Sequence, residues 1–202
     1  MPIVRNMSTD DLIGNAFTAL WLIFFVYWLL AALRIKRIKS AESAGSRLSY
    51  SIPVWAGYLL LLTPHRHWGP LARQVYPQSL ATALSGLALT AIGIGFAMWA
   101  RYTLGQNWSS KVTIKIDHEL IRSGPYAYVR HPIYTGILLA IMGTAIAIGE
   151  WRSLLALALF WGAFYRKART EEKMLAHEFG ERFAEHQQRT GFFIPRLAPR
   201  SN

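Results

Sequence analysis

The sequence predicts an all-α membrane protein with about five transmembrane helices, because apolar residues lie in long runs and charges lie between them. Of the 202 residues, 52% are apolar or aromatic and only 16% are charged, well below the roughly 25% usual for soluble domains. A helix needs about 20 apolar residues to cross the hydrocarbon core. Uncharged stretches of 13 to 27 residues recur along the chain, at 12–33, 48–65, 74–100, 131–149 and 153–165.

The first predicted span covers Leu12–Leu33 and contains the apolar run Trp21–Leu30. A cleaved signal peptide is a poorer interpretation, because this run exceeds the usual length of roughly 7–15 residues. Acidic residues, Asp10 and Asp11, also precede it in place of a basic region. We therefore expect a retained helix.

The remaining spans differ in length and composition. The second, Ser51–Thr63, has only 13 residues and reaches about 20 Å, so it must thin the bilayer or extend into its polar neighbours. The third, Ser79–Ala100, is rich in glycine and alanine, and small residues let membrane helices approach closely. We expect it to pack centrally. Ile133–Gly149 and Trp151–Tyr165 form the fourth and fifth spans, and the very short connection between them predicts an antiparallel helical hairpin.

The positions of lysine and arginine predict the orientation. Five of them lie in 34–50 and five in 101–130, and the segment after residue 165 is also basic, whereas the alternate connections carry few. Because cytoplasmic loops carry an excess of Lys and Arg, we expect an outside N-terminus and an inside C-terminus. The net charge of +11 is thus mainly explained by topology, with membrane lipid headgroups as further partners and no nucleic acid.

Two polar blocks lie on the predicted cytoplasmic side, the connection 101–132 and the tail 166–202. A connection of this length in a small membrane protein is long enough to carry function. We therefore expect residues 1–100 to form transmembrane helices one to three. Residues 101–202 are expected to form a catalytic region that consists of the connection, the hairpin, a C-terminal helix and the tail.

The tail is predicted to continue the fifth span as a helix. Leu175, Phe179 and Phe183 recur every four residues and form one apolar stripe among charged residues, a pattern typical of packing against a partner surface. Gly191 ends the pattern. The apolar segment Phe192–Pro195 that follows is expected to act as a plug.

The segment Ser123–Gly136 is the densest in candidate functional residues. Pro132 suits the first position of a helix, where its missing N–H costs nothing. Arg130 and His131 are therefore expected at a helix N-terminus, which favours anions, with Tyr134 one turn further along the same face. The alternative is an interfacial belt, in which aromatic residues and arginine anchor the helix at the headgroup level.

Glu171 and Glu172 form a second candidate cluster, two residues after Arg169 and just past the fifth span. One interpretation is a continuing helix with a solvated charged face. The other is that the hairpin returns this acidic pair toward Arg130 and His131. A site with an anion-binding end and an acidic end suits a zwitterion that also carries a cation.

Several short motifs of the C-terminal half resemble those of one known family. They are Leu104–Trp108, His118–Ile121, Gly124–Tyr126, Arg130–Gly136, Glu171-Glu172, Phe179-Gly180 and Phe193–Pro195. The pattern is similar to the isoprenylcysteine carboxyl methyltransferase family, and the related phospholipid N-methyltransferases share much of it. The combination of Arg-His-Pro-x-Tyr with Glu-Glu around a hairpin is its specific part. The resemblance covers about Leu104–Leu197, whereas spans one and two match only in being hydrophobic.

The resemblance implies S-adenosylmethionine as cofactor, with S-adenosylhomocysteine as its product. The cofactor would be held between the cytoplasmic ends of spans four and five and covered by the connection and the tail. The implied cofactor-binding residues are His118 and Leu120 near the adenine, Tyr126, Arg130, His131 and Tyr134 along the methionyl side, and Glu171 and Glu172 at the closing end. Arg130 suits the cofactor carboxylate, and a glutamate suits its ammonium or ribose hydroxyls.

The implied reaction is methyl transfer to a carboxylate of a lipophilic, isoprenoid or prenylcysteine-like acceptor that enters from the bilayer. A carboxylate is already ionised at neutral pH, so the protein must mainly exclude water and align the methyl group with its acceptor, a contribution of up to about 7–11 kcal/mol. We expect Arg130 to hold the carboxylate, with Arg169 as a weaker candidate. An amine acceptor must first lose a proton, for which Glu172 or a water-linked His131 is the candidate base.

Other functions remain open from the sequence. They are a phospholipid or other lipid amine N-methyltransferase, a membrane reductase with a nicotinamide cofactor, and a non-catalytic transporter or lipid-binding protein. The chain has no dinucleotide glycine fingerprint, and its spans carry no Asp, Glu, Lys or Arg at mid-depth, where a transport path usually has them. No metal site is expected, because the chain has no cysteine and His65 and His67 have no third ligand nearby.

Overall fold

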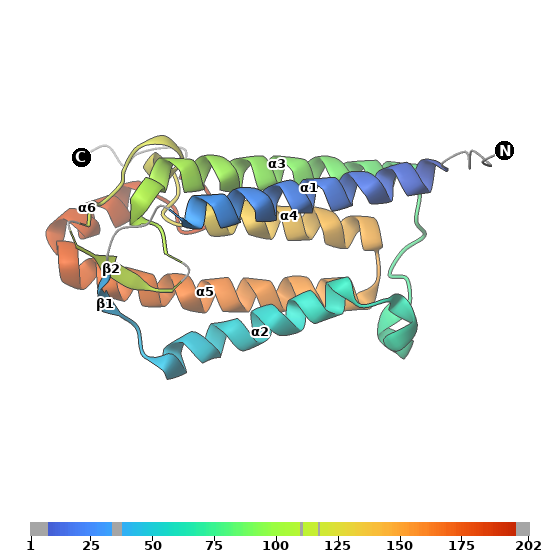
Figure 1. Cartoon of the computed structure of the whole chain (residues 1–202), viewed down its shortest axis with the longest axis horizontal. Coiled ribbons are helices and arrows are strands. Elements are labelled where there is room, and N and C mark those ends of the chain that lie inside the picture. Colours follow the sequence, from blue (N-terminus) through green and yellow to red (C-terminus); the bar gives the residue numbers. More distant parts are fainter. Residues whose placement is uncertain (1–7, 34–37, 110, 117, 197–202) are drawn as a thin grey trace.

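The computed structural model describes residues 8–33, 38–109, 111–116 and 118–196, and this part of the chain is mostly helical (Figure 1). Successive long helices run in alternate directions, so the start of the first and the end of the last lie at opposite ends of the bundle (Figure 1). The five long helices are α1 (Thr9–Ala32), α2 (Ala44–Leu62), α3 (Leu80–Leu104), α4 (Pro132–Ile148) and α5 (Trp151–Phe179). The predicted hairpin of the last two helices is confirmed.

Shorter elements complete the two ends of the bundle. The strands β1 and β2 and the helix α6 gather at one end, and the 3₁₀ turns η1 and η2 lie at the other, beside the turn between α4 and α5 (Figure 1). Their bounds are β1 Ile38–Ala41, η1 His65–His67, η2 Gly69–Ala72, η3 Gly105–Asn107, β2 Thr113–Lys115, η4 Gly124–Ala127 and α6 Glu181–Arg189.

The small sheet is a departure from the predicted all-α architecture. β1 and β2 pair antiparallel, with Ser40 opposite Ile114 and Ala41 opposite Thr113. The strands have only four and three residues, and all four residues of β1 are exposed. They therefore carry no alternating apolar pattern from which a strand could be recognised. The sheet joins the connection after α1 to the connection after α3.

Two of the described helices are long and apolar enough to cross a membrane by themselves, Thr9–Ala32 and Leu80–Asn107, and Pro132–Ile148 is apolar but shorter. The predicted second span is part of the longer helix α2. This helix begins at Ala44, where the side chain of Ser43 accepts a hydrogen bond from the N–H of Ser46 at 3.2 Å. The helix therefore extends beyond the apolar run 51–63 into its polar neighbours on the N-terminal side.

The backbones of α3 and α4 are almost in contact along a stripe of small residues. A Cβ atom built on Gly93 would lie 2.4 Å from the backbone nitrogen of Ala140, and one on Gly143 would lie 2.5 Å from the carbonyl oxygen of Gly86. Only glycine permits this approach. The hydroxyl of Thr90 donates to the carbonyl of Ala140 at 3.1 Å across the same interface. α3 packs against α1 as well, which agrees with its predicted central position.

Arg101 fixes the end of α3. Its side chain is buried, and its guanidinium donates to the carbonyls of Ala31 at 2.6 Å and Gly105 at 2.7 Å. The same group lies 4.5 Å from the centre of the Trp108 ring, a cation–π arrangement. One cation therefore ties the ends of α1 and α3 to the first residues of the connection.

Arg152 fixes the opposite end. It forms a buried ion pair with Glu150 in the turn between α4 and α5. Its guanidinium also donates to the carbonyls of Leu60 at 2.6 Å and Thr63 at 2.9 Å, at the end of α2. The turn itself begins at Gly149, whose φ of +63° is in the left-handed region that favours glycine.

The C-terminal tail begins as the continuation of α5, as predicted. The helix runs without interruption to Phe179, and Gly180, with a φ of +51°, then separates it from α6. The predicted apolar stripe is consequently split, because Leu175 lies on α5 and Phe183 on α6. Of the predicted apolar plug, Phe193 is buried in the main core cluster.

Replacement of Gly93 by leucine is expected to force α3 and α4 apart, because the new side chain has backbone atoms in its way. Overpacking of this kind costs about 1–3 kcal/mol or more. Thermal unfolding of the detergent-solubilised variant should therefore occur at a clearly lower temperature than for the wild type. The matched control is Gly95→Leu, at a position on the same helix with nothing within 4 Å. Equal stability of the two variants would contradict the packing described.

Candidate active site

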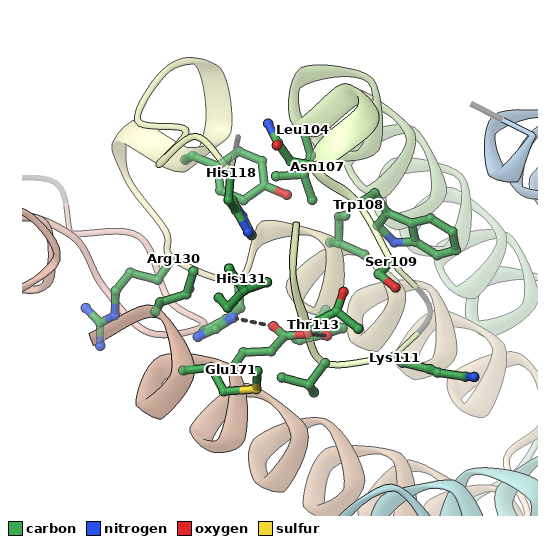
Figure 2. A pocket seen from close by; sticks show the side chains of 17 residues that line it. Leu104, Asn107, Trp108, Ser109, Lys111, Thr113, His118, Arg130, His131 and Glu171 are labelled. Atoms are coloured by element: carbon green, nitrogen blue, oxygen red, sulfur yellow. Dashed lines mark hydrogen bonds and ion pairs between the residues drawn. The ribbon is translucent and has the colours of Figure 1, made fainter. Parts of the chain in front are cut away.

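Figure 2 shows a cavity of about 120 Å³. Its lining residues belong to the end of the bundle that carries the small sheet and α6 (Figure 1). Its wall is built by residues far apart in the sequence. They are Leu104, Asn107, Trp108, Ser109, Lys111, Val112, Thr113 and Ile114 from the end of α3 and the connection, His118, Tyr126, Arg130 and His131 from later in the connection, Ile133 and Tyr134 from α4, and Glu171, Met174 and Leu175 from α5.

The predicted helix start at Pro132 places Arg130 and His131 beside the cavity. Pro132 is the first residue of α4 and His131 is its N-cap. The backbone N–H of Arg130 donates to the carbonyl of Gly191 at 2.9 Å, and that of His131 donates to the carbonyl of Phe192 at 3.3 Å. The tail therefore lies along the start of α4 and holds these two residues in place.

The hairpin brings the acidic pair onto these residues. The Nε of Arg130 lies 2.6 Å from Oε1 of Glu172. The ring of His131 lies between the two glutamates, with Nε2 3.3 Å from Glu172 Oε1 and Nδ1 3.5 Å from Glu171 Oε2. The hydroxyl of Tyr134 donates to Glu171. The interpretation of the pair as a solvated charged face is wrong for Glu172, which is only 5% exposed.

The two glutamates face different partners. Glu171 lines the cavity, and Glu172 is not among the lining residues. Glu172 contacts Arg130, His131 and, at 3.6 Å, Arg169. It therefore fixes the cations around it, while Glu171 presents a carboxylate to the space that a ligand could occupy.

Most donors of Arg130 are already used. In addition to the pair with Glu172, its Nη1 donates to the carbonyls of Thr190 at 2.5 Å and Gln187 at 3.2 Å. Figure 2 shows its guanidinium turned away from the centre of the cavity. Nη2 has no hydrogen-bond partner among the described residues, and it is the donor that remains for a ligand.

The charges of this cluster stabilise one another. Burial by itself lowers the pKa of His131, but its hydrogen bonds to Glu171 and Glu172 and their negative charges outweigh burial and raise this pKa above its usual value. Burial raises the pKa of each glutamate, and the hydrogen bond from His131 together with the neighbouring cations, Lys167 for Glu171 and Arg130 for Glu172, reverses the shift, so both pKa values are lowered. The carboxylates thus favour the protonated form of His131, and the neighbouring cations favour the ionised form of both glutamates.

The other predicted cofactor residues lie nearby. His118 and Tyr126 line the cavity, and the ring of His118 packs edge-on against Phe179 at 5.6 Å. Leu120 does not line it. This residue borders a smaller cavity of about 60 Å³, which shares His118, Tyr126 and Arg130 with the first. The structure thus gathers all eight predicted residues at one end of the bundle, seven around the cluster and cavity and Leu120 in the adjoining space.

Sequence reasoning missed part of the cavity wall and its support. Val112 and Thr113 were not singled out, and neither was Glu42, whose carboxylate accepts a hydrogen bond from the N–H of Val112 at 3.1 Å. One signal was available, because Glu42 is the single acidic residue in the basic segment 34–50. His186 was also missed. It is buried on α6, and burial and then the charges of nearby cations, Arg122 first, lower its pKa to about 4.

Comparison with known proteins identifies the same region. Residues 86–177 match the model of the isoprenylcysteine carboxyl methyltransferase (ICMT) family. The protein-S-isoprenylcysteine O-methyltransferase of Schizosaccharomyces pombe is 33% identical over 114 residues, which cover 55% of this chain and 48% of that protein. The human protein of the same name is 26% identical over 195 residues, 94% of this chain and 67% of that protein. The cobalt-zinc-cadmium resistance protein CzcN of Cupriavidus metallidurans is 34% identical over 140 residues, 68% of this chain and 58% of that protein.

The chain thus spans about half the length of several relatives that it matches. Its fold is similar to the solved structure of a eukaryotic intramembrane Ras methyltransferase, ICMT, with a TM-score of 0.63 and 20% identity, over 96% of this chain and 70% of that one. At this identity the likeness shows the fold. The family match includes the Arg130–Tyr134 motif and both glutamates that the hairpin brings together. Residues 86–177 of this chain are therefore similar to the isoprenylcysteine carboxyl methyltransferase family.

Proposed function

We propose that the protein is an integral membrane methyltransferase that transfers a methyl group from S-adenosylmethionine to the carboxylate of a lipophilic, prenylcysteine-like acceptor. One observation carries the proposal. The ion-paired cluster of Arg130, His131, Glu171 and Glu172 borders a cavity, and it lies in the region that matches the family model. Relatives named protein-S-isoprenylcysteine O-methyltransferase support the class of acceptor.

The charges of the cluster suit the proposed cofactor. S-adenosylmethionine carries a carboxylate, an ammonium and a sulfonium, so its site needs both signs of charge. Glu171 is the carboxylate that lines the cavity, and we assign it to the ammonium or the ribose hydroxyls. The remaining donor of Arg130, Nη2, is assigned to the carboxylate of the cofactor. Glu172 is not among the residues that line the cavity, and we assign it the role of holding Arg130 and His131 in position.

The chemistry demands alignment and exclusion of water more than acid–base catalysis. A carboxylate nucleophile and a sulfonium lose charge as they react, so bulk water would favour the separated ions. The cavity wall opposite the charged cluster is partly apolar, with Leu104, Trp108 and Val112. An acceptor that lies against this wall would have its carboxylate in a poorly hydrated space, in line with the methyl group.

The cavity is smaller than most binding sites. Sites for small molecules usually measure about 300–1,000 Å³, more than the 120 Å³ of this cavity. The connection between α3 and α4 supplies much of its wall. We propose that this connection moves outward when the cofactor binds and returns to cover it.

The proposed topology has five spans and the site on the cytoplasmic face. It is supported by the alternating directions of the five long helices (Figure 1), by the two helices that are long and apolar enough to span a membrane, and by the basic connections at the site end. The N-terminus then lies outside and the C-terminus inside. Residues 1–100 supply the first three spans, and residues 101–202 supply the catalytic region.

The direct test uses the purified full chain in detergent. Calorimetric titration with S-adenosylhomocysteine should show one binding site, and radiolabelled S-adenosylmethionine should label N-acetyl-S-farnesylcysteine in a base-labile, ester form. The matched control acceptor is the methyl ester of the same compound, which has no free carboxylate and should take no label. Absence of cofactor binding would overturn the proposal, and base-stable label on membrane lipids would indicate N-methylation.

A second prediction concerns Glu172. The variant Glu172→Gln keeps the shape of the side chain but leaves Arg130 and His131 without their shared negative charge. Loss of one partner of a buried, hydrogen-bonded charge pair costs about 2–5 kcal/mol, so kcat/KM for methyl transfer should fall at least about tenfold.

The control for this variant is Glu181→Gln, an exposed position in the first turn of α6. Its kcat/KM should equal that of the wild type. A Glu172→Gln protein with unchanged kcat/KM would show that the cluster only anchors the helix, as in the interfacial-belt interpretation.

A further inference from the structure

The first connection of the chain supports the cavity, although it lies outside the residues that match the family model. Glu42 and Val112 are linked twice. The N–H of Glu42 donates to the carbonyl of Val112 at 3.0 Å, and the N–H of Val112 donates to the carboxylate of Glu42 at 3.1 Å. Val112 and Thr113, the first residue of β2, line the cavity. One carboxylate from the N-terminal half therefore holds part of the cavity wall.

A lysine links this carboxylate to Glu171. Lys167 lies on α5, one turn before Glu171, and its Nζ is 5.3 Å from the centre of the Tyr50 ring and 5.4 Å from that of Tyr134. The hydroxyl of Tyr50 donates to Glu42. The hydroxyl of Tyr134 donates to Glu171. The ammonium group thus lies between two tyrosines, each of which is hydrogen-bonded to a different glutamate.

The two glutamates act on the same cation. Burial lowers the pKa of Lys167, and the negative charges of Glu171 and then Glu42 oppose this effect. The second carboxylate oxygen of Glu42 is buried and has no hydrogen-bond partner in the described part of the chain, so no described donor screens its charge on that side. The single charge of Lys167 is consequently shared between a carboxylate that lines the cavity and one that does not.

We propose that Glu42 is a positioning residue that acts through Lys167. Because Glu42 neutralises part of the positive charge of Lys167, Glu171 keeps more of its negative charge for a cationic ligand in the cavity. The inference rests on the proposed function, because S-adenosylmethionine carries a sulfonium charge that S-adenosylhomocysteine lacks. When Glu42 is neutral, Lys167 has lost one of the two glutamates whose charges act on it. The cavity then becomes more positive and disfavours the sulfonium.

The experiment compares the dissociation constants of these two ligands, because a merely structural defect would weaken both alike. The variant Glu42→Gln keeps an oxygen that can accept from Val112 and Tyr50 but has no charge. Its ratio of the Kd for S-adenosylmethionine to the Kd for S-adenosylhomocysteine should rise about fivefold relative to the wild type. Calorimetry on the full chain in detergent provides both constants.

Two further variants keep the test decisive. Lys167→Met removes the shared cation, so the ratio should fall below that of the wild type, and adding Glu42→Gln to this variant should change it no further. The matched control is Glu178→Gln. Glu178 lies on α5, as Lys167 does, and it is paired at 2.7 Å with Lys39 of β1. Its ratio should equal that of the wild type.

The outcomes separate this inference from the proposed function. A wild-type protein that binds neither ligand overturns the proposed function itself. A wild type that binds both, together with a Glu42→Gln variant whose ratio is unchanged, overturns only the role of Glu42. Failure of Glu42→Gln to fold leaves Lys167→Met as the test, and an unchanged ratio in that variant contradicts the inference equally.

Discussion

The candidate site depends on the ion pairs that the buried carboxylate of Glu172 forms with Arg130 and His131. This carboxylate holds Arg130 and His131 at the start of α4 from its position on α5, and Arg130 in turn binds the carbonyls of Gln187 and Thr190 near the end of α6. The start of α4, helix α5 and the end of α6 are thus held together around the carboxylate of Glu172. Because the desolvation cost of a buried ion pair can exceed its attraction, such a pair is weak evidence for stability. Its effect is geometric, since it fixes the helix start, the hairpin and the tail around one cavity.

The rest of the fold delivers these elements to the same place. The close contact of α3 and α4 at Gly93 and Gly143 fixes where the connection between them leaves and returns. Arg101 ties the start of that connection to the end of α1, and the pairing of β1 with β2 ties its middle to the segment before α2. The N-terminal half therefore helps to determine the shape of the cavity wall.

The sequence alone predicted which distant segments of the chain come together at the site. Uncharged runs located the helices, and Pro132 located the start of α4. The short hairpin turn implied that Glu171 and Glu172 return toward Arg130 and His131. Other features had no local signal. The pairing of β1 with β2 joins segments some 70 residues apart. Each of these strands is too short to show a periodic pattern. The contacts of Glu42, which follows β1 directly, depend on this pairing. The different orientations of Glu171 and Glu172 follow from side-chain packing, which two adjacent letters do not reveal.

We propose that the methyl donor binds between the connection, the start of α4 and the C-terminal part of α5. The most direct measurement is hydrogen exchange, followed by mass spectrometry, of the full chain with and without saturating S-adenosylhomocysteine. The account predicts slower exchange of the amides in 107–114 and 126–135 when the ligand is present, and no change in 65–72 at the other end of the bundle. Slower exchange confined to 65–72, or none anywhere despite saturation, would contradict it.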